Sequence, residues 1–496
     1  MTFQTNFPLG PTKLPYVTVS AKGMSNGLSD IPNDGFDFGP DTLLGTSSKG
    51  LYGPPYTQTS GIQEAYNYGK IKYNNNWGGV FTIVLGEGIF VLNADVNLSI
   101  GVTATDTSRP ATVNIIGQGI RSTMVLINQP NLNGIAISNP SSDYSVEDTT
   151  FAHFAIDIAY GYPNTWGNTV INNVASNPTG SGANSAISYL LYGSGGQGTV
   201  LNLNDMHLFT GNWISNGPTN GGLYVWGSVN VIATNSTFMG DRALALIGSA
   251  NALAGGSSNY NPMLFSTFTG CYIGLSPNIY ITGYLVSIRG SDFGGTNINL
   301  NYNSTTMGLT TNVAIEDSTV VGYNSLFNLT NATVNFIKLH GINLIPGGGT
   351  NVLLTSSSPV IAGLLDMHDV ANTSSIPNLA NNVSFSEYII EGFETVSGTA
   401  MTLPTQSTTS GTTAGTVKMD AVIYRTSYKK YVITFSGYEN DTTTNQTINY
   451  PLPFSTSAVI TGNNTGLTIS TTTSGITITS PNSTTTYSGI VIVEGY

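Results

Sequence analysis

The stretch "TSGIQEAYNYGKIKYNNNWGGVFTIVLGEGIF", residues 59–90, decides the fold of this chain. Its first part, "GIQEAYNYGKI", predicts one short helix, and the apolar residues on both sides of the Gly-containing turn in "VFTIVLGEGIF" predict two strands. Its only carboxylates are Glu64 and Glu87, and nothing in the local pattern pairs them. The stretch therefore predicts a helix that leads directly into β-structure, with no chemistry of its own.

Eight later runs share one pattern, in which alternating apolar residues are followed by a short turn and a further apolar residue. Aligned on the turn, the runs place at equivalent positions Asp157, Asp205, Asn235, Gly270, Gly290, Asp317, Leu339 and Met367. Spacings that lie mostly between 20 and 35 residues indicate a solenoid whose coils share one apolar core. Asp and Asn tolerate left-handed backbone, so we interpret Asp157, Asp205, Asn235 and Asp317 as turn residues.

Changes in composition predict four segments. Residues 1–58 are rich in Pro and Gly and predict an extended arm, and residues 59–393 carry the helix and the β-coils. Residues 394–417 are rich in Ser, Thr and Gly and predict a linker or neck. In residues 418–496, short β-rich runs alternate with turn residues, which predicts a small antiparallel β-sandwich.

Ionisable side chains are scarce in this chain. Only 8% of the residues are Asp, Glu, Lys or Arg, and 14 basic residues against 26 acidic ones leave a net charge of −12. This balance argues against nucleic-acid binding, which requires basic surfaces. The single cysteine, Cys271, cannot form an internal disulfide and is expected to be a small buried residue.

The first residues, "MTFQTNFPLG", show no signal-peptide pattern, and no apolar run is long enough for a membrane span. We therefore expect a protein that reaches the exterior by another route, such as virion assembly and release. Because few side chains change charge, we also expect an acidic exterior and stability down to about pH 2.

Four stretches, "DGFDFGPDT", "SGIQEAYNYG", "FTIVLGEGIFVLN" and "VNIIGQGIRST", resemble the N-terminal entry of pectate-lyase-like β-helix proteins. That superfamily includes polysaccharide lyases, glycosidases and viral tailspikes. The C-terminal "YKKYVITFSGYENDTTTNQTINYPLPF" resembles the terminal β-domains of viral fibres, and the charge-poor composition resembles virion surface proteins of viruses of thermoacidophilic archaea. The resemblance implies an all-β chain: a right-handed parallel β-helix, capped by the helix, with a C-terminal β-sandwich.

The resemblance also implies a function. The expected protein is a virion spike or tail fibre that attaches to host surface glycans, forms a homotrimer, and contacts other virion proteins through its N-terminal arm. Two alternatives stay open: a tailspike that cleaves polysaccharide, as a glycosidase or lyase, and a non-viral extracellular adhesin. The fold alone does not decide between them.

Catalytic residues are not evident. Glycoside hydrolysis needs two carboxylates across the scissile bond, and the candidates are Asp157, Asp205, Asp241, Glu316, Asp317, Asp366 and Asp369. None lies in a diagnostic motif, so no catalytic residue and no cofactor is assigned. The motif "DMH" occurs at 205–207 and 366–368, where residues two apart share a strand face and could bind metal. With four histidines in the chain, no metal site is assigned.

Aromatic residues gather between residues 160 and 226. An exposed set of rings beside amide and hydroxyl groups suits sugars, which have apolar C–H faces and polar rims. The alternative is that the rings cover the core or pack against a neighbouring subunit. The predicted carbohydrate-binding residues are Trp166, Tyr189, Tyr192, Trp213, Tyr224 and Trp226.

Overall fold

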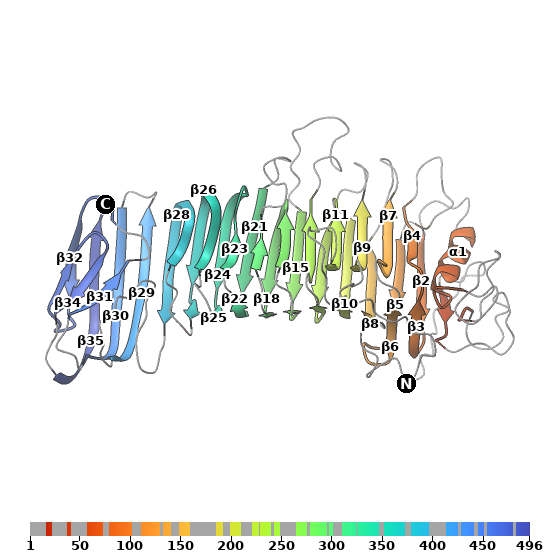
Figure 1. Cartoon of the computed structure of the whole chain (residues 1–496), viewed down its shortest axis with the longest axis horizontal. Coiled ribbons are helices and arrows are strands. Elements are labelled where there is room, and N and C mark those ends of the chain that lie inside the picture. The colour runs from red at the N-terminus through yellow and green to blue at the C-terminus, as the bar shows by residue number, and fades with distance from the viewer. Residues whose placement is uncertain are drawn as a thin grey trace, which may run out of the picture. The chain divides into compact units, whose positions relative to one another are not determined.

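Two compact units make up the chain, residues 1–245 with 249–262 and residues 246–248 with 263–496. The structure, a computed structural model, describes residues 16–21, 37–40, 57–72, 79–101, 110, 112–128, 132–139, 148–158, 185–191, 199–209, 221–227, 229–239, 243–248, 264–274, 278–294, 297–300, 310–323, 325–346, 352–372, 378–395, 413–424, 428–440, 445–450, 454–479 and 483–496. Both units contain coils of a right-handed parallel β-helix (Figure 1), as the sequence predicts. Within the described part of the chain, no helix is long and apolar enough to cross a membrane.

The first unit begins with a strand and a helix and continues as coils. Its elements are β1 (Tyr16–Val19), α1 (Ile62–Lys72), β2 (Val80–Leu85), β3 (Gly88–Leu92), β4 (Val96–Ser99), β5 (Thr112–Ile116), β6 (Thr123–Ile127), β7 (Ile135–Asn139), β8 (Thr149–Ile158), β9 (Ser185–Leu191), β10 (Thr199–Phe209), β11 (Gly221–Trp226), β12 (Val229–Thr234) and β13 (Thr237–Met239). Each coil has three segments that pair in parallel with the next coil, β2 with β5, β3 with β6 and β4 with β7. The longer β8 and β10 each run through two segments.

The second unit continues the same plan and ends in antiparallel strands. After β14 (Leu244–Ile247), where the chain passes between the units, its elements are β15 (Leu264–Thr269), β16 (Tyr272–Gly274), β17 (Asn278–Thr282), β18 (Tyr284–Arg289), β19 (Asp292–Gly294), β20 (Asn297–Asn299), β21 (Thr310–Glu316), β22 (Thr319–Tyr323), β23 (Ser325–Asn328), β24 (Thr333–His340), β25 (Asn343–Pro346), β26 (Val352–His368), β27 (Ala371–Asn372), β28 (Asn378–Thr395), β29 (Thr413–Tyr424), β30 (Tyr428–Asn440), β31 (Gln446–Asn449), β32 (Ala458–Asn463), β33 (Ile469–Thr471), β34 (Gly475–Ile478) and β35 (Ser483–Gly495). Its coils pair in three parallel rows that begin at β15, β16 and β17.

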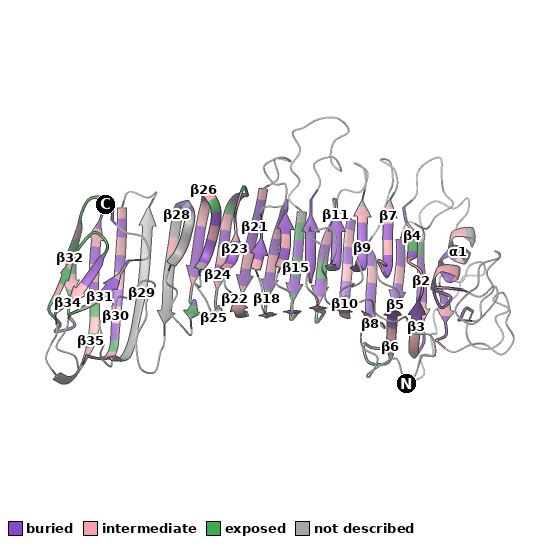
Figure 2. Ribbon diagram, in the orientation of Figure 1, coloured by how far each residue is buried: buried purple, intermediate pink, exposed green. Residues whose placement is uncertain are grey.

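Inward side chains of successive coils stack in columns. One column of the second unit, fully buried and in register, contains Phe268, Ile288, Ile315, Leu339 and Met367. Burial of a side chain of this size stabilises the fold by about 1.5–3 kcal/mol. Buried and more exposed residues alternate along many of the strands (Figure 2), because successive strand residues point to opposite faces. The outward half of each strand is therefore free to carry other chemistry.

One residue with left-handed backbone marks the corner between the first and second segments of a coil. These residues, with φ between 48° and 63°, are His153, Asp205, Asn235, Gly270, Gly290, Asp317, Gly341 and Asp369. The residue after each corner is buried, as Met206 and Val370 are. Five of the eight turn positions expected from the sequence are confirmed: Asp205, Asn235, Gly270, Gly290 and Asp317.

The other three turn predictions are wrong. Asp157 lies inside β8, opposite Leu126, and the corner of its coil is His153.

Leu339 and Met367 belong to the buried column, and their corners follow two residues later, at Gly341 and Asp369. All three errors are shifts by an even number of residues. The side-chain pattern of a strand repeats every two residues, so such a shift leaves the same face inward. Only the left-handed backbone of the corner residue distinguishes the correct turn position from the shifted one.

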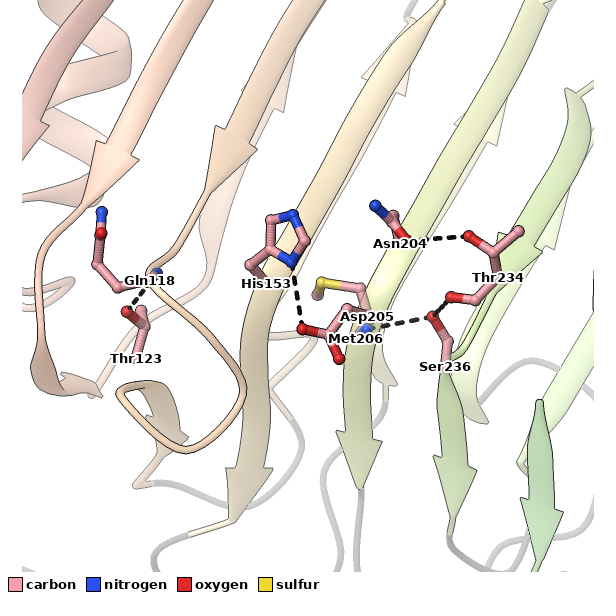
Figure 3. Close-up of polar contacts among 8 residues, drawn as sticks. All are labelled: Gln118, Thr123, His153, Asn204, Asp205, Met206, Thr234 and Ser236. Atoms are coloured by element: carbon pink, nitrogen blue, oxygen red, sulfur yellow. Dashed lines mark hydrogen bonds and ion pairs between the residues drawn. The ribbon is translucent and has the colours of Figure 1, made fainter. Parts of the chain in front are cut away.

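Serines that follow a corner join neighbouring coils by hydrogen bonds. The Ser291 hydroxyl accepts a hydrogen bond from the backbone N–H of Cys271 at 3.1 Å and donates one to the carbonyl of Arg289 at 3.0 Å. Figure 3 shows the same contact in the first unit, where the N–H of Met206 donates to the Ser236 hydroxyl at 3.1 Å. Each serine thus satisfies a buried N–H of the preceding coil. Cys271 itself is buried, as expected, and its Sγ lies 3.5 Å from the carbonyl oxygen of Thr269.

The short helix expected in residues 59–90 is α1, which packs on the first coil. Ile62 and Ala65 are fully buried, and the Gln63 side chain bonds both the N–H of Asn97 at 2.6 Å and its carbonyl at 3.0 Å. The amide side chain thereby occupies backbone groups of β4 that a further coil would otherwise pair. Strand β1, which lies within the segment predicted as an extended arm, pairs in parallel with β2.

An antiparallel β-sandwich ends the second unit, as the sequence predicts. Strand β28 pairs antiparallel with β29, and β29, β30, β35 and β32 form one sheet. The second sheet contains β31, β34 and β33. The Tyr431 ring stacks on Tyr450 with centroids 4.7 Å apart, and Phe454 lies edge-on to both. Strand β29 begins at Thr413, inside the predicted linker, of which residues 396–412 lie outside the described residues.

The corner hydrogen bonds predict a selective loss of stability. We expect Ser291→Ala to lower the free energy of unfolding by about 1–3 kcal/mol, because the buried N–H of Cys271 loses its acceptor. Ser287→Ala, on the outward face of β18 just before this corner, is the matched control and should change the free energy of unfolding by less than about 0.5 kcal/mol. Equilibrium unfolding in denaturant measures both changes. Equal midpoints for the two variants would contradict the stabilising role of the corner serine hydrogen bonds.

Candidate functional site

Two neighbouring coils of the second unit bring His340, Asp366 and His368 together. His340 is the last residue of β24 and His368 the last residue of β26, and the two are opposite one another in register. Asp366 precedes His368 by two residues and shares its outward face, because Met367 between them is fully buried. The strand register therefore creates a three-residue cluster, which we call the His340 cluster.

The Asp366 carboxylate lies between the two imidazole rings. Its Oδ1 is 2.8 Å from Nε2 of His368, and its Oδ2 is 3.3 Å from Nε2 of His340. The ring centroids are 4.7 Å apart, with the planes at 75°. Asp366 is 7% exposed, whereas one third of each histidine side chain is exposed. The carboxylate is thus covered, and the rings border the solvent.

Lys338 is the fourth polar group of this region. It is opposite Asp366 in register, its Nζ lies 3.8 Å from Oδ2 of Asp366, and it also lies 5.5 Å from the ring centroid of Phe336. The His340 cluster contains one carboxylate, so it lacks the pair that glycoside hydrolysis requires. Two imidazole nitrogens and one carboxylate are, however, donors that divalent transition metals accept.

The other "DMH" motif occupies a different place in its coil. Asp205 is itself the corner residue, Met206 points inward, and His207 follows in the next segment of β10. The Asp205 carboxylate lies 3.2 Å from Nδ1 of His153, the corner residue of the preceding coil (Figure 3). The same three letters therefore produce a pair at one position and a cluster at the other.

The remaining carboxylates considered for catalysis lie on several coils. Asp317 pairs with Nε of Arg289 at 3.2 Å, and both side chains are largely exposed. Glu316 ends β21 and is opposite His340 of the next coil in register. Asp241 lies outside the described residues. Each ion-paired cluster described here contains a single carboxylate.

The six aromatic residues predicted to bind sugar do not form one described surface. Outside the described residues lie Trp166, Tyr192 and Trp213. Tyr189 is fully buried on β9 and is opposite Val225, which is also fully buried; its ring therefore belongs to the core, and burial raises its pKa. Tyr224 and Trp226 are two residues apart on β11; Tyr224 is 9% exposed and Trp226 is half-buried. Tyr189 is thus corrected from a surface residue to a core residue.

A row of outward side chains on the second segment of the coils was not anticipated. Tyr272, Asp292, Thr319 and Asn343 occupy equivalent positions in four successive coils, in register. Tyr272 and Asp292 are exposed, and Thr319 and Asn343 are half-buried. Adjacent members lie about 4.8 Å apart. We call these four residues the Tyr272 row.

Glycines form a floor beneath the Tyr272 ring. A Cβ added at Gly274 would lie 2.3 Å from the ring, and one at Gly294 would lie 3.4 Å from its hydroxyl oxygen. Val321, 42% exposed, is opposite Gly294 in the next coil. An aromatic ring beside carboxylate, hydroxyl and amide groups is a surface suited to a sugar. The repeat of "YIG" at 272–274 and "DFG" at 292–294 is the sequence signal that could have revealed it.

The fold and these outward rows define a protein of the parallel β-helix class. No family model matches the chain, and no curated protein matches it. Among solved structures, the chain is similar to ORF18 of Geobacillus virus E2, at 13% identity and a TM-score of 0.31, over 76% of this chain and 71% of that one. It is also similar to a pectin methylesterase solved in complex with hexasaccharide VII, at 11% identity and a TM-score of 0.27, over 53% and 75%. At such scores the likeness assigns no function.

His207 predicts a pH dependence of stability. Burial lowers its pKa in the folded protein, while the unfolded chain keeps a value of about 6.5. The stability that the neutral ring contributes is therefore fully present above about pH 6.5 and is lost as the pH falls through the lowered folded value. We expect the unfolding midpoint to fall less steeply below pH 6.5 in His207→Gln than in the wild type. If the unfolding midpoints of the variant and the wild type fall in parallel below pH 6.5, the prediction is contradicted, because His207 then does not limit stability in acid.

Proposed function

We propose that this protein is a virion surface spike or tail fibre that attaches to glycans on the host cell through the sides of its coils. The Tyr272 row is the observation that carries the glycan part of the proposal. Its exposed ring offers an apolar face, while Asp292, Thr319 and Asn343 offer hydrogen-bonding groups in steps of about 4.8 Å. A polymer with repeated hydroxyl groups matches such a regular series.

The charged groups of the described residues favour attachment over cleavage. The pairs Asp317 with Arg289 and Asp205 with His153 each hold one carboxylate, as does the His340 cluster, and hydrolysis of a glycosidic bond needs two. With 8% charged residues in the whole chain, binding depends mainly on neutral hydrogen bonds and aromatic contact. Such contacts are less sensitive to salt than ion pairs are.

The assignment to a virion rests on sequence resemblance, at the entry stretch and at the C-terminal β-domain. In this proposal the segment 1–58 contacts other virion proteins, and the chain acts as a homotrimer on the virion surface. Three copies would present three equivalent rows, and linked weak sites bind a repetitive surface far more tightly than one site does.

Two measurements test this proposal directly. Purified virions produced in the host should contain the protein, and the protein should bind isolated host-envelope glycans without changing them. Release of reducing ends or unsaturated products during the incubation would instead indicate a hydrolase or lyase. Absence of the protein from virions, with binding retained, would favour a cellular adhesin.

The Tyr272 row predicts a specific loss of binding. We expect Tyr272→Ala to weaken glycan binding about fivefold or more, because it removes the aromatic platform, a contribution of about 1 kcal/mol or more. Phe265→Ala is the matched control, since Phe265 is 53% exposed on β15, the preceding strand of the same coil. A glycan array with both variants and the wild type measures the effect. Equal losses for the two variants would place the binding surface elsewhere.

A further inference from the structure

We propose that His340, Asp366 and His368 form a binding site for a divalent first-row transition-metal ion, with zinc as the reference ion. The site joins two neighbouring coils of the second unit, because His340 ends β24 whereas Asp366 and His368 belong to β26. It is independent of the Tyr272 row and of glycan attachment.

The donor set suits such an ion. Two imidazole nitrogens and one carboxylate oxygen are common protein ligands of zinc, with bonds of about 2.0–2.2 Å, and catalytic zinc sites often have three protein ligands. Donor atoms around a tetrahedral ion at such bond lengths lie about 3.4 Å apart. In the structure, one donor atom from each residue lies within 4.8 Å of the others, and the closest pairs are separated by 2.8 and 3.3 Å. Small side-chain shifts would therefore make room for an ion.

Hydrogen bonding does not account for this arrangement. Oδ1 of Asp366 and Nε2 of His340 are both covered from solvent, yet within the described residues neither has a hydrogen-bond partner of acceptable geometry. The 2.8 Å contact between Asp366 and His368 has the length of a hydrogen bond but not its direction. Buried polar atoms without a partner cost about 1–3 kcal/mol each. A metal ion among the three donors would satisfy these atoms at once.

Lys338 competes with the ion for the carboxylate. Its ammonium lies 3.8 Å from Oδ2 of Asp366, and 38% of its side chain is exposed. A bound cation would repel the ammonium, and the flexible lysine chain can carry its charge out into the solvent. The partial exposure of both imidazoles leaves a side from which water can complete the coordination.

Metal binding at this position would stabilise the contact between the two coils. A ligand that binds the folded state alone stabilises it in proportion to the logarithm of its concentration over its dissociation constant. Because the ligands come from strands of two coils, the unfolded chain does not hold them in place. Zinc should therefore raise the unfolding temperature of the protein.

The test uses the full chain without a histidine tag, freed of metal by a chelator. Isothermal titration with zinc chloride should show one site per chain, and saturating zinc should raise the unfolding midpoint by several degrees. Cobalt(II), used as a coloured substitute, should develop the visible absorption of a site with nitrogen and oxygen ligands. A wild-type protein that binds neither ion would overturn the proposal.

Variants identify the ligands. His340→Ala and His368→Ala should each weaken zinc binding at least about tenfold, with an unchanged circular-dichroism spectrum. The matched control is His207→Ala, which removes the histidine of the other "DMH" motif and should bind zinc as the wild type does. Lys338→Met should bind zinc more tightly, since the competing charge is gone.

Two outcomes would contradict the assignment. Zinc binding that survives the double variant His340→Ala/His368→Ala, or that is lost equally in His207→Ala, would place the ion elsewhere. If a histidine variant fails to fold, Asp366→Asn replaces it, because asparagine preserves the size of the side chain. The test is then whether the cobalt(II) absorption spectrum of Asp366→Asn differs from that of the wild type. A retained cobalt spectrum in Asp366→Asn would exclude the carboxylate as a ligand.

Discussion

Every surface of interest in this protein depends on one backbone constraint, the single left-handed residue at the first corner of a coil. Corner residues such as Asp317 and Gly341 have φ near 50–60°, a conformation that most residues avoid. The following residue then turns into the core, and the parallel register of the coils continues from there. His340 directly precedes a corner, and Tyr272 lies two residues after one. The corner therefore decides which side chains share an outward row.

Much of the fold could be predicted from the sequence, because its signals are local. Alternating apolar residues and a recurrent turn indicate stacked coils, and Asn, Asp and Gly are the residues that accept a left-handed corner. Where the corner is Gly341 or Asp369, the apolar residues before it fit the pattern equally well. The turn was therefore predicted two residues too early, at Leu339 and Met367. His153 was overlooked because histidine occupies this conformation far less often than glycine does.

The clusters could not be predicted in the same way, because their members come from different coils. His340 lies on β24 and Asp366 on β26, and the sequence does not state how these two strands are aligned. The two "DMH" motifs are identical in letters, yet one begins at a corner and the other ends just before one. Tyr189 was misplaced for a related reason: without a corner nearby, the inward face of β9 was undetermined.

The glycine floor beneath Tyr272 shows how separate the inside and the outside of a coil are. Inward columns require apolar side chains of matched volume, whereas outward rows require only a strand. Substitutions in a row can therefore alter what the surface recognises while the core and the register remain unchanged. If the protein attaches to host glycans as proposed, such a scaffold would allow recognition to diverge one coil at a time.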